Sequence, residues 1–395
     1  MRADRPRVAF VVQRYGPEIT GGSESLARAV AERLLGDYRI TVFTSCAVDY
    51  VTWRNALPEG TQDVNGVEVR RFAAVAERDL DAFNAFSEPL YRAPRSREEE
   101  IEWLRRQGPE TPALVEALAA EAERFHAVVF FTYLYYPAYW GLEAAPARSV
   151  LVPTAHDEPP LRFSIYDEMF ARPRAFAFLT GPEEELVRWR FEIGQRPAAV
   201  AGIGIDMPVA ADGAAFRDRR SLHVPYALYA GRIDAGKGCA EMIAHHAAYR
   251  AAGGGADLVL IGSLAMDLPA VPGVRYLGLL SEEDKAAAIA GARVVVCSSP
   301  YESLSIVLLE AFAAGVPGLV NARSAVLKDH CLRANAGLFY GDADEFAAAL
   351  DLLVTDDALR AGMGASGRRY VEAHYRWDAV LDRYRAIIEA AAATR

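Results

Sequence analysis

The chain has 395 residues, which exceeds one ordinary hydrophobic core and suits two domains of about 200 residues each. Two cores imply a cleft between them. Hydrophobic residues make up 52% of the chain and charged residues 24%, a composition that excludes a disordered chain and a membrane channel. The formal net charge of −10 argues against a nucleic-acid partner, because phosphate backbones are bound by clustered lysine and arginine.

Four cysteines are scattered along the chain without a C-x-x-C pair: Cys46, Cys239, Cys297 and Cys331. This usage is typical of reduced thiols rather than of a disulfide framework or a zinc site. The amino terminus lacks the small-residue cleavage pattern of a signal peptide. The longest apolar stretch, 127–142, contains Pro137 and falls short of the roughly 20 residues that span a bilayer. We expect a cytoplasmic protein without a transmembrane helix, and peripheral membrane contact stays open.

Short runs rich in Val, Ile and Phe alternate with longer Ala-, Leu- and Glu-rich stretches in both halves of the chain. This pattern predicts an α/β fold with β-α units around parallel sheets. In the first half the expected strands are 7–12, 40–45, 67–71, 127–131, 150–154 and 175–180. In the second half they are 227–230, 257–262, 274–277, 293–298, 318–321 and 338–340.

The first predicted strand leads into a loop with paired glycines, Gly21 and Gly22, before an Ala-rich helix. Paired glycines permit close approach of the backbone to a ligand, and a simple tight turn explains them equally well. They do not form Gly-x-Gly-x-x-Gly, so the dinucleotide fingerprint of a dehydrogenase is missing.

Residues 76–125 form a polar, acidic insertion without strand alternation, which includes an Arg-Glu-Glu-Glu run at 97–100. We expect helices packed beside the first sheet, with either a solvated face or an acceptor-side lid. Five aromatic residues then follow the strand 127–131, and core packing explains them better than stacking on an acceptor. They are Tyr133, Tyr135, Tyr136, Tyr139 and Trp140.

His156 follows the strand 150–154 and has the most site-like setting of the seven histidines. A neutral imidazole there could orient a substrate hydroxyl, and a protonated one could favour a departing phosphate. A structural histidine capped by Asp157 fits the local sequence as well.

The domain boundary is expected in the segment 202–208, where glycines and a proline follow a short apolar strand. The predicted domains are 1–204 and 205–375, with a terminal helix over 376–395. The pattern is helical from Asp356 onward, with four apolar positions at Tyr370, Trp377, Val380 and Tyr384.

Two cations occupy a glycine-flanked loop after the strand 227–230: Arg232 and Lys237. The carboxyl end of a strand is where open α/β sheets bind ligands. Arginine can present a bidentate fork and lysine a mobile charge to a diphosphate, and together they could replace a metal ion. A polar turn with solvated cations is the alternative.

The segment 300–315 predicts a strand, a loop and then a helix that starts near Ser303 and stops at Gly315. The backbone amides of Leu304, Ser305 and Ile306 would then belong to the helix start and suit a phosphate. Glu302 and Glu310 would lie about 12 Å apart along the axis, which is close to the span of a sugar diphosphate ribose. Ionised carboxylates accept hydrogen bonds from hydroxyls. A surface helix with two unrelated glutamates remains the alternative.

Two Asp-x-Asp triplets, 79–81 and 342–344, lack further oxygen or imidazole ligands nearby in sequence. No metal and no cofactor are therefore expected.

These motifs, in this order, resemble the large fourth family of retaining glycosyltransferases (glycosyl transferases group 1) with the GT-B fold, and the match runs through nearly the whole chain. The fold implied is two Rossmann-like domains facing each other across a cleft. The activity implied is transfer of a sugar from a nucleotide-diphosphate donor to a hydroxyl acceptor.

The resemblance also implies roles for individual residues. Arg232 and Lys237 contact the donor diphosphate, Glu302 contacts the transferred sugar, and Glu310 contacts the ribose. A base pocket lies near Leu280, the amides of Ser305 and Ile306 lie near the phosphate, and His156 lies beside the donor sugar. The implied donor-side set comprises Gly22, Arg232, Lys237, Leu280, Leu304, Ser305, Ile306 and Glu310. The final helix is expected to cross back onto the first domain.

Two other functions remain open: a sugar-nucleotide epimerase of the same architecture and a non-catalytic sugar-nucleotide-binding subunit. The sequence leaves the donor base, the sugar, the acceptor, the linkage and the oligomeric state undetermined. The acceptor candidates are a glycan, a lipid-linked sugar and a small metabolite.

Overall fold

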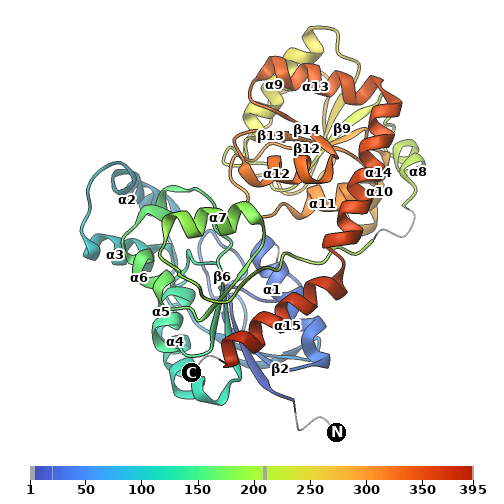
Figure 1. Ribbon diagram of the computed structural model, residues 1–395. Coiled ribbons are helices and arrows are strands. Elements are labelled where there is room, and N and C mark those ends of the chain that lie inside the picture. The colour runs from blue at the N-terminus through green and yellow to red at the C-terminus, as the bar shows by residue number, and fades with distance from the viewer. Residues whose placement is uncertain (1–4, 20, 208–210, 394–395) are drawn as a thin grey trace. The chain divides into compact units, whose positions relative to one another are not determined.

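The computed structural model describes residues 5–19, 21–207 and 211–393. The chain divides into two compact units: Met1–Ile203 with Leu381–Arg395 form the first, and Gly204–Val380 form the second. The predicted limits are 204 for the first domain and 375 for the second, and Pro208 of the expected boundary segment lies outside the described residues. Figure 1 shows a sheet with helices beside it in each unit.

The sheet of the first unit has, within the described residues, eight strands in the order β3-β4-β2-β1-β5-β6-β7-β8. Their bounds are β1 Arg7–Val11, β2 Arg39–Ser45, β3 Gly60–Val64, β4 Val67–Phe72, β5 Ala127–Phe131, β6 Ser149–Val152, β7 Ala175–Phe178 and β8 Ala198–Val200. All neighbours are parallel except β3 and β4. The strand order reverses between β1 and β5, which is where open α/β sheets bind ligands.

The helices of the first unit have these bounds: α1 Gly22–Arg33, η1 Leu34–Gly36, α2 Leu80–Arg92, α3 Arg97–Gln107, α4 Pro112–Glu121, η2 Ala122–Arg124, α5 Tyr136–Ala144, η3 Pro159–Arg162, α6 Ile165–Ala171 and α7 Gly181–Arg190. The insertion 76–125 supplies α2, α3 and α4, which contribute buried residues to the core. Trp103 of α3 is 1% exposed and donates its indole N–H to Ser87 Oγ at 2.9 Å.

Two glutamates of the acidic run at 97–100, Glu99 and Glu100, make hydrogen bonds within the first unit. Ser96 and Glu99 form a capping box at the start of α3. Glu100 is 2% exposed and accepts hydrogen bonds from Ser164 Oγ at 2.7 Å and from the Ile165 N–H at 3.0 Å. Arg97, Glu98 and Glu99 are exposed, as the solvated face predicts, and Glu100 alone of this run is buried.

The last helix, α15 (Trp377–Ala393), joins the first unit from Leu381 onward. Tyr384 is buried and donates its hydroxyl to the Gly202 carbonyl at 3.2 Å. Glu389 accepts from the Tyr38 hydroxyl at 2.9 Å. These contacts hold α15 against two distant parts of the first unit, one near Tyr38 and one near Gly202.

The sheet of the second unit has, in the described part of that unit, six parallel strands in the order β11-β10-β9-β12-β13-β14. Their bounds are β9 Tyr226–Ala230, β10 Asp257–Ile261, β11 Val274–Tyr276, β12 Val294–Cys297, β13 Gly318–Asn321 and β14 Gly337–Tyr340. The chain builds outward from β9 to β11, returns to the other side of β9 and continues to β14. The order therefore reverses between β9 and β12.

The helices of the second unit are α8 Gly213–Arg219, α9 Cys239–Ala251, α10 Glu282–Gly291, α11 Ile306–Ala313, α12 Ala325–Ala334, α13 Ala343–Thr355 and α14 Asp357–His374. Helix α8 packs on α10, α9 on α13, and α11 on α14. Small residues permit the last contact, since a side chain at Gly364 would overlap the Gly315 carbonyl oxygen.

Each of the twelve predicted strands overlaps an observed strand, so these predictions are confirmed. The chain also forms β3 and β8, which complete the first sheet. Among the helices of the described residues, none combines the length and the apolar character needed to cross a bilayer.

Candidate active site

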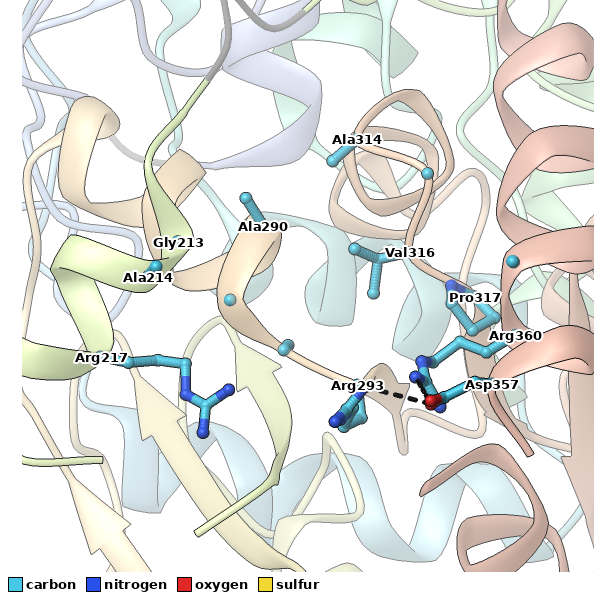
Figure 2. Close-up of a pocket in the computed structure, with 14 residues that line it drawn as sticks. Gly213, Ala214, Arg217, Ala290, Arg293, Ala314, Val316, Pro317, Asp357 and Arg360 are labelled. Atoms are coloured by element: carbon cyan, nitrogen blue, oxygen red, sulfur yellow. Dashed lines mark hydrogen bonds and ion pairs between the residues drawn. The ribbon is translucent and has the colours of Figure 1, made fainter. Parts of the chain in front are cut away.

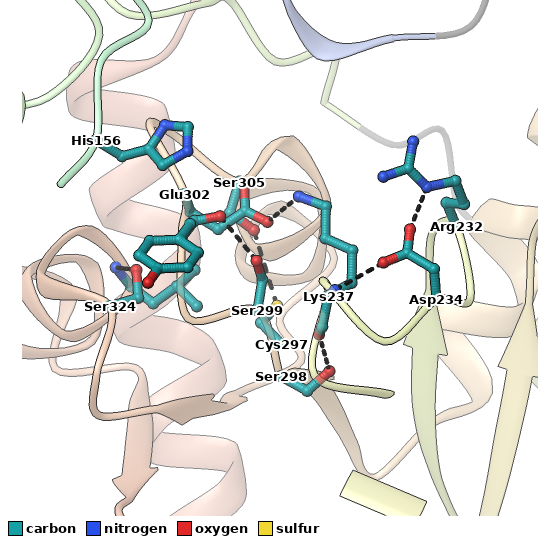
Figure 3. A network of polar contacts seen from close by, with 12 residues as sticks. His156, Arg232, Asp234, Lys237, Cys297, Ser298, Ser299, Glu302, Ser305 and Ser324 are labelled. Carbon is teal, nitrogen blue, oxygen red and sulfur yellow. Dashed lines mark hydrogen bonds and ion pairs between the residues drawn. The ribbon is translucent and has the colours of Figure 1, made fainter. Parts of the chain in front are cut away.

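Two loops meet at the reversal point of the second sheet, where β9 and β12 lie side by side. The loop 231–238 follows β9 and the loop 298–305 follows β12. Because parallel strands end at the same edge of a sheet, both loops gather at the carboxyl edge (Figure 3). Arg232, Lys237 and Glu302 are thereby brought together, as the sequence predicts.

Asp234 holds the loop 231–238 in shape. Its Oδ1 accepts from the backbone N–H of Lys237 at 2.8 Å, and its Oδ2 pairs with Arg232 Nε. Gly238 caps α9 with φ 71°, and a side chain there would overlap the Ser298 carbonyl oxygen of the neighbouring loop. Asp234 is absent from the predicted site, although an aspartate before a Gly-Lys-Gly turn is a recognisable turn signal.

Lys237 and Glu302 form an ion pair that bridges the two loops. Lys237 Nζ donates to Glu302 Oε1 at 2.8 Å, and the two side chains are 35% and 20% exposed (Figure 3). The exposure leaves both groups open to a ligand at this edge. The pair also keeps the lysine charge at the reversal point, where a phosphate would need it.

The helix after Glu302 begins later than the sequence predicts. Helix α11 starts at Ile306, and Ser305 is its N-cap with φ 66° and ψ 80°. The start near Ser303 is therefore wrong, and so is the helical spacing between Glu302 and Glu310, because Glu302 lies in the loop. The N–H groups of Ser305 and Ile306 still precede the first bond inside the helix, from Leu309 N–H to Ser305 O at 3.4 Å. Leu304 lies outside the helix start.

The predicted stop of α11 at Gly315 is confirmed. Gly315 has φ 76°, its N–H donates to the Phe312 carbonyl at 2.9 Å, and the next N–H, from Val316, donates to the Ala311 carbonyl at 2.8 Å. This pair of bonds is the Schellman arrangement that a glycine favours.

His330 of α12 contacts the loop 298–305 through the Leu304 carbonyl. Its Nε2 lies 3.0 Å from the Leu304 carbonyl oxygen and its Nδ1 lies 3.2 Å from the Tyr370 hydroxyl. Burial lowers the pKa of His330 to about 4, so the ring is neutral at pH 7. A neutral ring donates from Nε2 to Leu304 and accepts from Tyr370 at Nδ1. His330 was not predicted, because it lies 26 residues from the loop that it supports.

We expect the His330→Gln variant to lose less stability in acid than the wild type. The folded pKa of about 4 lies below the ordinary value of about 6.5, so the stabilising contribution is complete above pH 6.5 and is lost as the pH falls through 4. The difference amounts to about 3 kcal/mol. Urea unfolding of both proteins at pH 7 and pH 4 measures it, and an equal loss in the two proteins would refute the role assigned to His330.

Glu310 lies on α11 and pairs with Lys285 of α10. Lys285 Nζ donates to Glu310 Oε1 at 2.9 Å, and both side chains are 26% exposed. Burial raises the pKa of the Glu310 carboxyl, and the lysine charge opposes that rise. Lys285 therefore pairs with Glu310 as Lys237 pairs with Glu302, and it was not among the predicted site residues.

Leu280 lies in the loop after β11, at the same edge of the sheet. Gly278 adopts φ 77° and accepts a hydrogen bond from the Gly262 N–H at 2.9 Å, which ties this loop to the loop after β10. Leu280 is half-buried and Leu279 is exposed. The segment is open enough to line a base pocket, and that role stays a prediction.

Gly22 and His156 belong to the first unit. Gly22 is the first residue of α1, after β1, and a Cβ there would meet open space. His156 follows β6 and lies 3.4 Å, from Nε2 to Oε2, from Glu158 rather than beside Asp157. Asp157, the alternative partner of His156 in the sequence analysis, pairs with Arg162.

The backbone before His156 is fixed by Glu183, which accepts from the Ala155 N–H at 2.7 Å and whose pKa burial raises to about 8. Of the aromatic residues after β5, Tyr133, Tyr136 and Tyr139 are buried, as core packing predicts, whereas Tyr135 and Trp140 are half-buried. Asp79 and Asp342 accept hydrogen bonds from the first turns of α2 and α13. The two Asp-x-Asp triplets therefore serve as helix caps.

The family model described as Glycosyl transferases group 1 matches residues 216–370. The lipopolysaccharide core biosynthesis glycosyltransferase LpsE of Rhizobium meliloti is 31% identical over 134 residues, covering 33% of this chain and 38% of that protein. A GDP-mannose-dependent monoacylated alpha-(1-6)-phosphatidylinositol monomannoside mannosyltransferase of Corynebacterium glutamicum is 29% identical over 150 residues, covering 34% of this chain and 39% of that protein. The match thus spans about two fifths of the length of these curated relatives.

Solved structures match over nearly the whole chain. Sucrose-phosphate synthase from Thermosynechococcus elongatus superposes with a TM-score of 0.73 at 19% identity and covers 98% of this chain and 100% of that one. The Anabaena protein HepE, solved in complex with UDP and glucose, superposes with a TM-score of 0.68 at 12% identity and covers 97% and 99%. Residues 216–370 of the second unit are therefore similar to the glycosyl transferases group 1 model, and the chain as a whole has the GT-B fold.

Proposed function

We propose that the protein is a retaining glycosyltransferase of family 4 that moves a sugar from a nucleotide-diphosphate donor to a hydroxyl acceptor. The observation that carries the proposal is the Lys237–Glu302 pair at the reversal point of the second sheet, beside Arg232 and the start of α11. Two cations, two backbone amides and a carboxylate are the groups that a diphosphate linked to a sugar requires.

The donor diphosphate is assigned to Arg232, Lys237 and the amides of Ser305 and Ile306. Negative charge grows on the diphosphate as it leaves, and fixed cations stabilise that charge more in the transition state than in the ground state. Glu302 is assigned to hydroxyls of the transferred sugar, Glu310 to the ribose and Leu280 to the base. Because two cations supply the charge, the reaction is proposed to need no metal.

Retention is proposed to follow from attack on the same face as departure. The acceptor oxygen bonds to the anomeric carbon while the bond from that carbon to the phosphate oxygen breaks. The electron pair goes to the leaving diphosphate, and a diphosphate oxygen takes the acceptor proton. The protein then contributes positioning and charge, and His156 orients a hydroxyl of the donor sugar.

For the donor we propose only its class, a nucleoside diphosphate sugar, and for the acceptor only that it carries a hydroxyl group. One relative is named as GDP-mannose-dependent, and the HepE structure contains UDP. What these share is a nucleoside diphosphate. All four cysteines lie among the described residues and are buried free thiols, which supports a reducing, cytoplasmic place of action.

A panel of UDP-, GDP- and ADP-sugars, screened by thermal shift, tests the donor assignment. A donor at 100 times its dissociation constant stabilises the protein by about 2.7 kcal/mol, which ranks the candidates. The matching nucleosides without phosphates serve as controls and are expected to give a much smaller shift, since they lack the diphosphate that is assigned to Arg232 and Lys237. Stabilisation by a nucleoside equal to that by its sugar diphosphate would contradict the assignment.

Gly22→Ala is expected to reduce kcat/KM at least tenfold while the melting temperature stays at or above that of the wild type. A Cβ at Gly22 meets open space in the protein, and alanine favours the helix that begins there. Only a ligand close to the backbone can therefore be obstructed. Steady-state kinetics and thermal unfolding measure the two effects, and unchanged kinetics would remove Gly22 from the site.

A further inference from the structure

A polar cavity lies in the second unit, away from the loops that carry the proposed donor site. Its volume is about 410 Å³, within the range of small-molecule sites. Arg293 directly precedes β12 and Pro317 directly precedes β13, so the cavity lies at the amino edge of the sheet (Figure 2). We call it the arginine pocket, after Arg217, Arg293 and Arg360, which line it.

Close backbone contacts place the three arginines. A side chain at Gly213 of α8 would overlap the backbone of Gly291 at the end of α10, so α8 lies tightly on α10 and directs Arg217 into the pocket. Helix α14 lies equally close to Gly315 and carries Arg360. The other lining residues are mostly glycine and alanine, so the guanidinium groups dominate the wall.

The charges in the pocket do not balance. One carboxylate, Asp357, lines the pocket together with three guanidinium groups; it pairs with Arg293 and Arg360 and is 80% exposed. Arg360 pairs with Asp357 and donates to the Leu353 carbonyl at 3.1 Å. Helices α8 and α14 begin at the pocket while α10 and α11 end there, so their dipoles offset one another. The flanking carboxylates Asp212 and Asp356 accept from the amides of their own helices.

Arg293 and Arg217 each have N–H groups that a ligand in the pocket could engage. Within the described part of the chain, Arg293 Nε is buried without a hydrogen-bond partner, and the contact from its Nη1 to Asp357 is long at 3.4 Å. Arg217 donates through Nε to the Leu222 carbonyl at 3.2 Å, and its terminal nitrogens donate to none of the described residues. Burial lowers the pKa of Arg293, and the charges of Arg360 and Arg217 lower it further, although Asp357 opposes them.

We propose that the arginine pocket is a binding site for a phosphate monoester of a small molecule, separate from the donor site. Guanidinium forks match phosphate oxygens in paired hydrogen bonds, and a dianion would neutralise the charge that Asp357 leaves uncompensated. The cavity accommodates the rest of a small metabolite.

Calorimetric titration of the full chain with glycerol 3-phosphate at constant ionic strength tests the proposal. We expect saturable binding to the wild type, binding at least tenfold weaker in Arg217→Gln, and unchanged binding in Lys237→Ala, which alters the donor site. Arg219→Gln is the matched control, because this exposed arginine lies on the same helix and pairs with Asp284 on the surface.

Arg217→Gln is expected to fold, because the substitution removes one hydrogen bond, from Arg217 Nε to the Leu222 carbonyl. Arg293→Gln, which removes the buried donor, is the second variant and is expected to show the same loss. Absence of binding to the wild type would overturn the proposal. Unchanged binding in Arg217→Gln and Arg293→Gln, or its loss in Lys237→Ala, would also overturn it and would place the phosphate elsewhere.

Discussion

Lys237→Ala is expected to lower kcat/KM for donor turnover by roughly 10²- to 10³-fold, the usual cost of removing one preorganised group that stabilises transition-state charge. The lysine bridges the two loops at the reversal point, where Glu302 holds its charge in place near Arg232. Its loss also leaves Glu302 without its cation, which adds negative charge where the diphosphate would leave. Steady-state kinetics with the donor selected by thermal shift measures the effect.

Lys328→Ala is the matched control for that experiment. Lys328 is another lysine of the second unit, and its ammonium lies 5.4 Å from the centre of the Phe339 ring. Its replacement is expected to leave turnover near the wild-type value. Turnover of Lys237→Ala within a factor of about three of the control would refute the assignment of Lys237 to the leaving group.

Gly262→Ala is expected to lower the free energy of unfolding by about 3 kcal/mol and to weaken donor binding. Gly262 has φ 129°, a conformation that costs a side chain about 1–3 kcal/mol, and a Cβ there would overlap the Gly231 carbonyl oxygen. Relief of that overlap moves Gly231 and with it the loop that carries Arg232. Denaturant unfolding and thermal shift with donor measure the two effects.

Gly362→Ala is the control, because it is expected to raise the free energy of unfolding where Gly262→Ala lowers it. Gly362 lies exposed in α14, where a Cβ meets nothing, and alanine in a helix is favoured over glycine by about 0.5–1 kcal/mol. The variant is expected to be slightly more stable and fully able to bind donor. A Gly262→Ala protein as stable as this control would contradict the close approach of the two backbones.

The parallel strands could be predicted because strands buried on both faces are continuous apolar runs, as in 127–131. Strand β3 was not predicted, because its residues, Gly-Thr-Gln-Asp-Val, are mostly polar and largely exposed at the edge of the sheet. One signal was available. Asn65 and Gly66 have φ 53° and 86° and join β3 to β4 as a hairpin turn that favours this dipeptide.

The donor-side residues could be predicted as pairs of charges after strands, whereas their arrangement depends on distant contacts. The start of α11 is delayed because His330 holds the Leu304 carbonyl and Ser305 adopts a left-handed conformation. Neither fact is visible in the local sequence. Lys285 reaches Glu310 across 25 residues, a pairing that only the packing of α10 beside α11 reveals.

The arginine pocket could not be predicted for the same reason. Its cations come from three separate segments, and each has an ordinary sequence context on a helix or before a strand. Only the contact between Gly213 and Gly291, and that between Gly315 and Gly364, bring the segments together.

The most direct test of the proposed function is a proton NMR time course of the selected nucleotide sugar with an acceptor mixture. We predict that nucleoside diphosphate appears in step with a new glycosidic signal that has the anomeric configuration of the donor. A glycosidic signal of inverted configuration would contradict retention. A changed sugar still attached to the nucleotide, or a bound donor that transfers to no acceptor, would contradict sugar transfer itself.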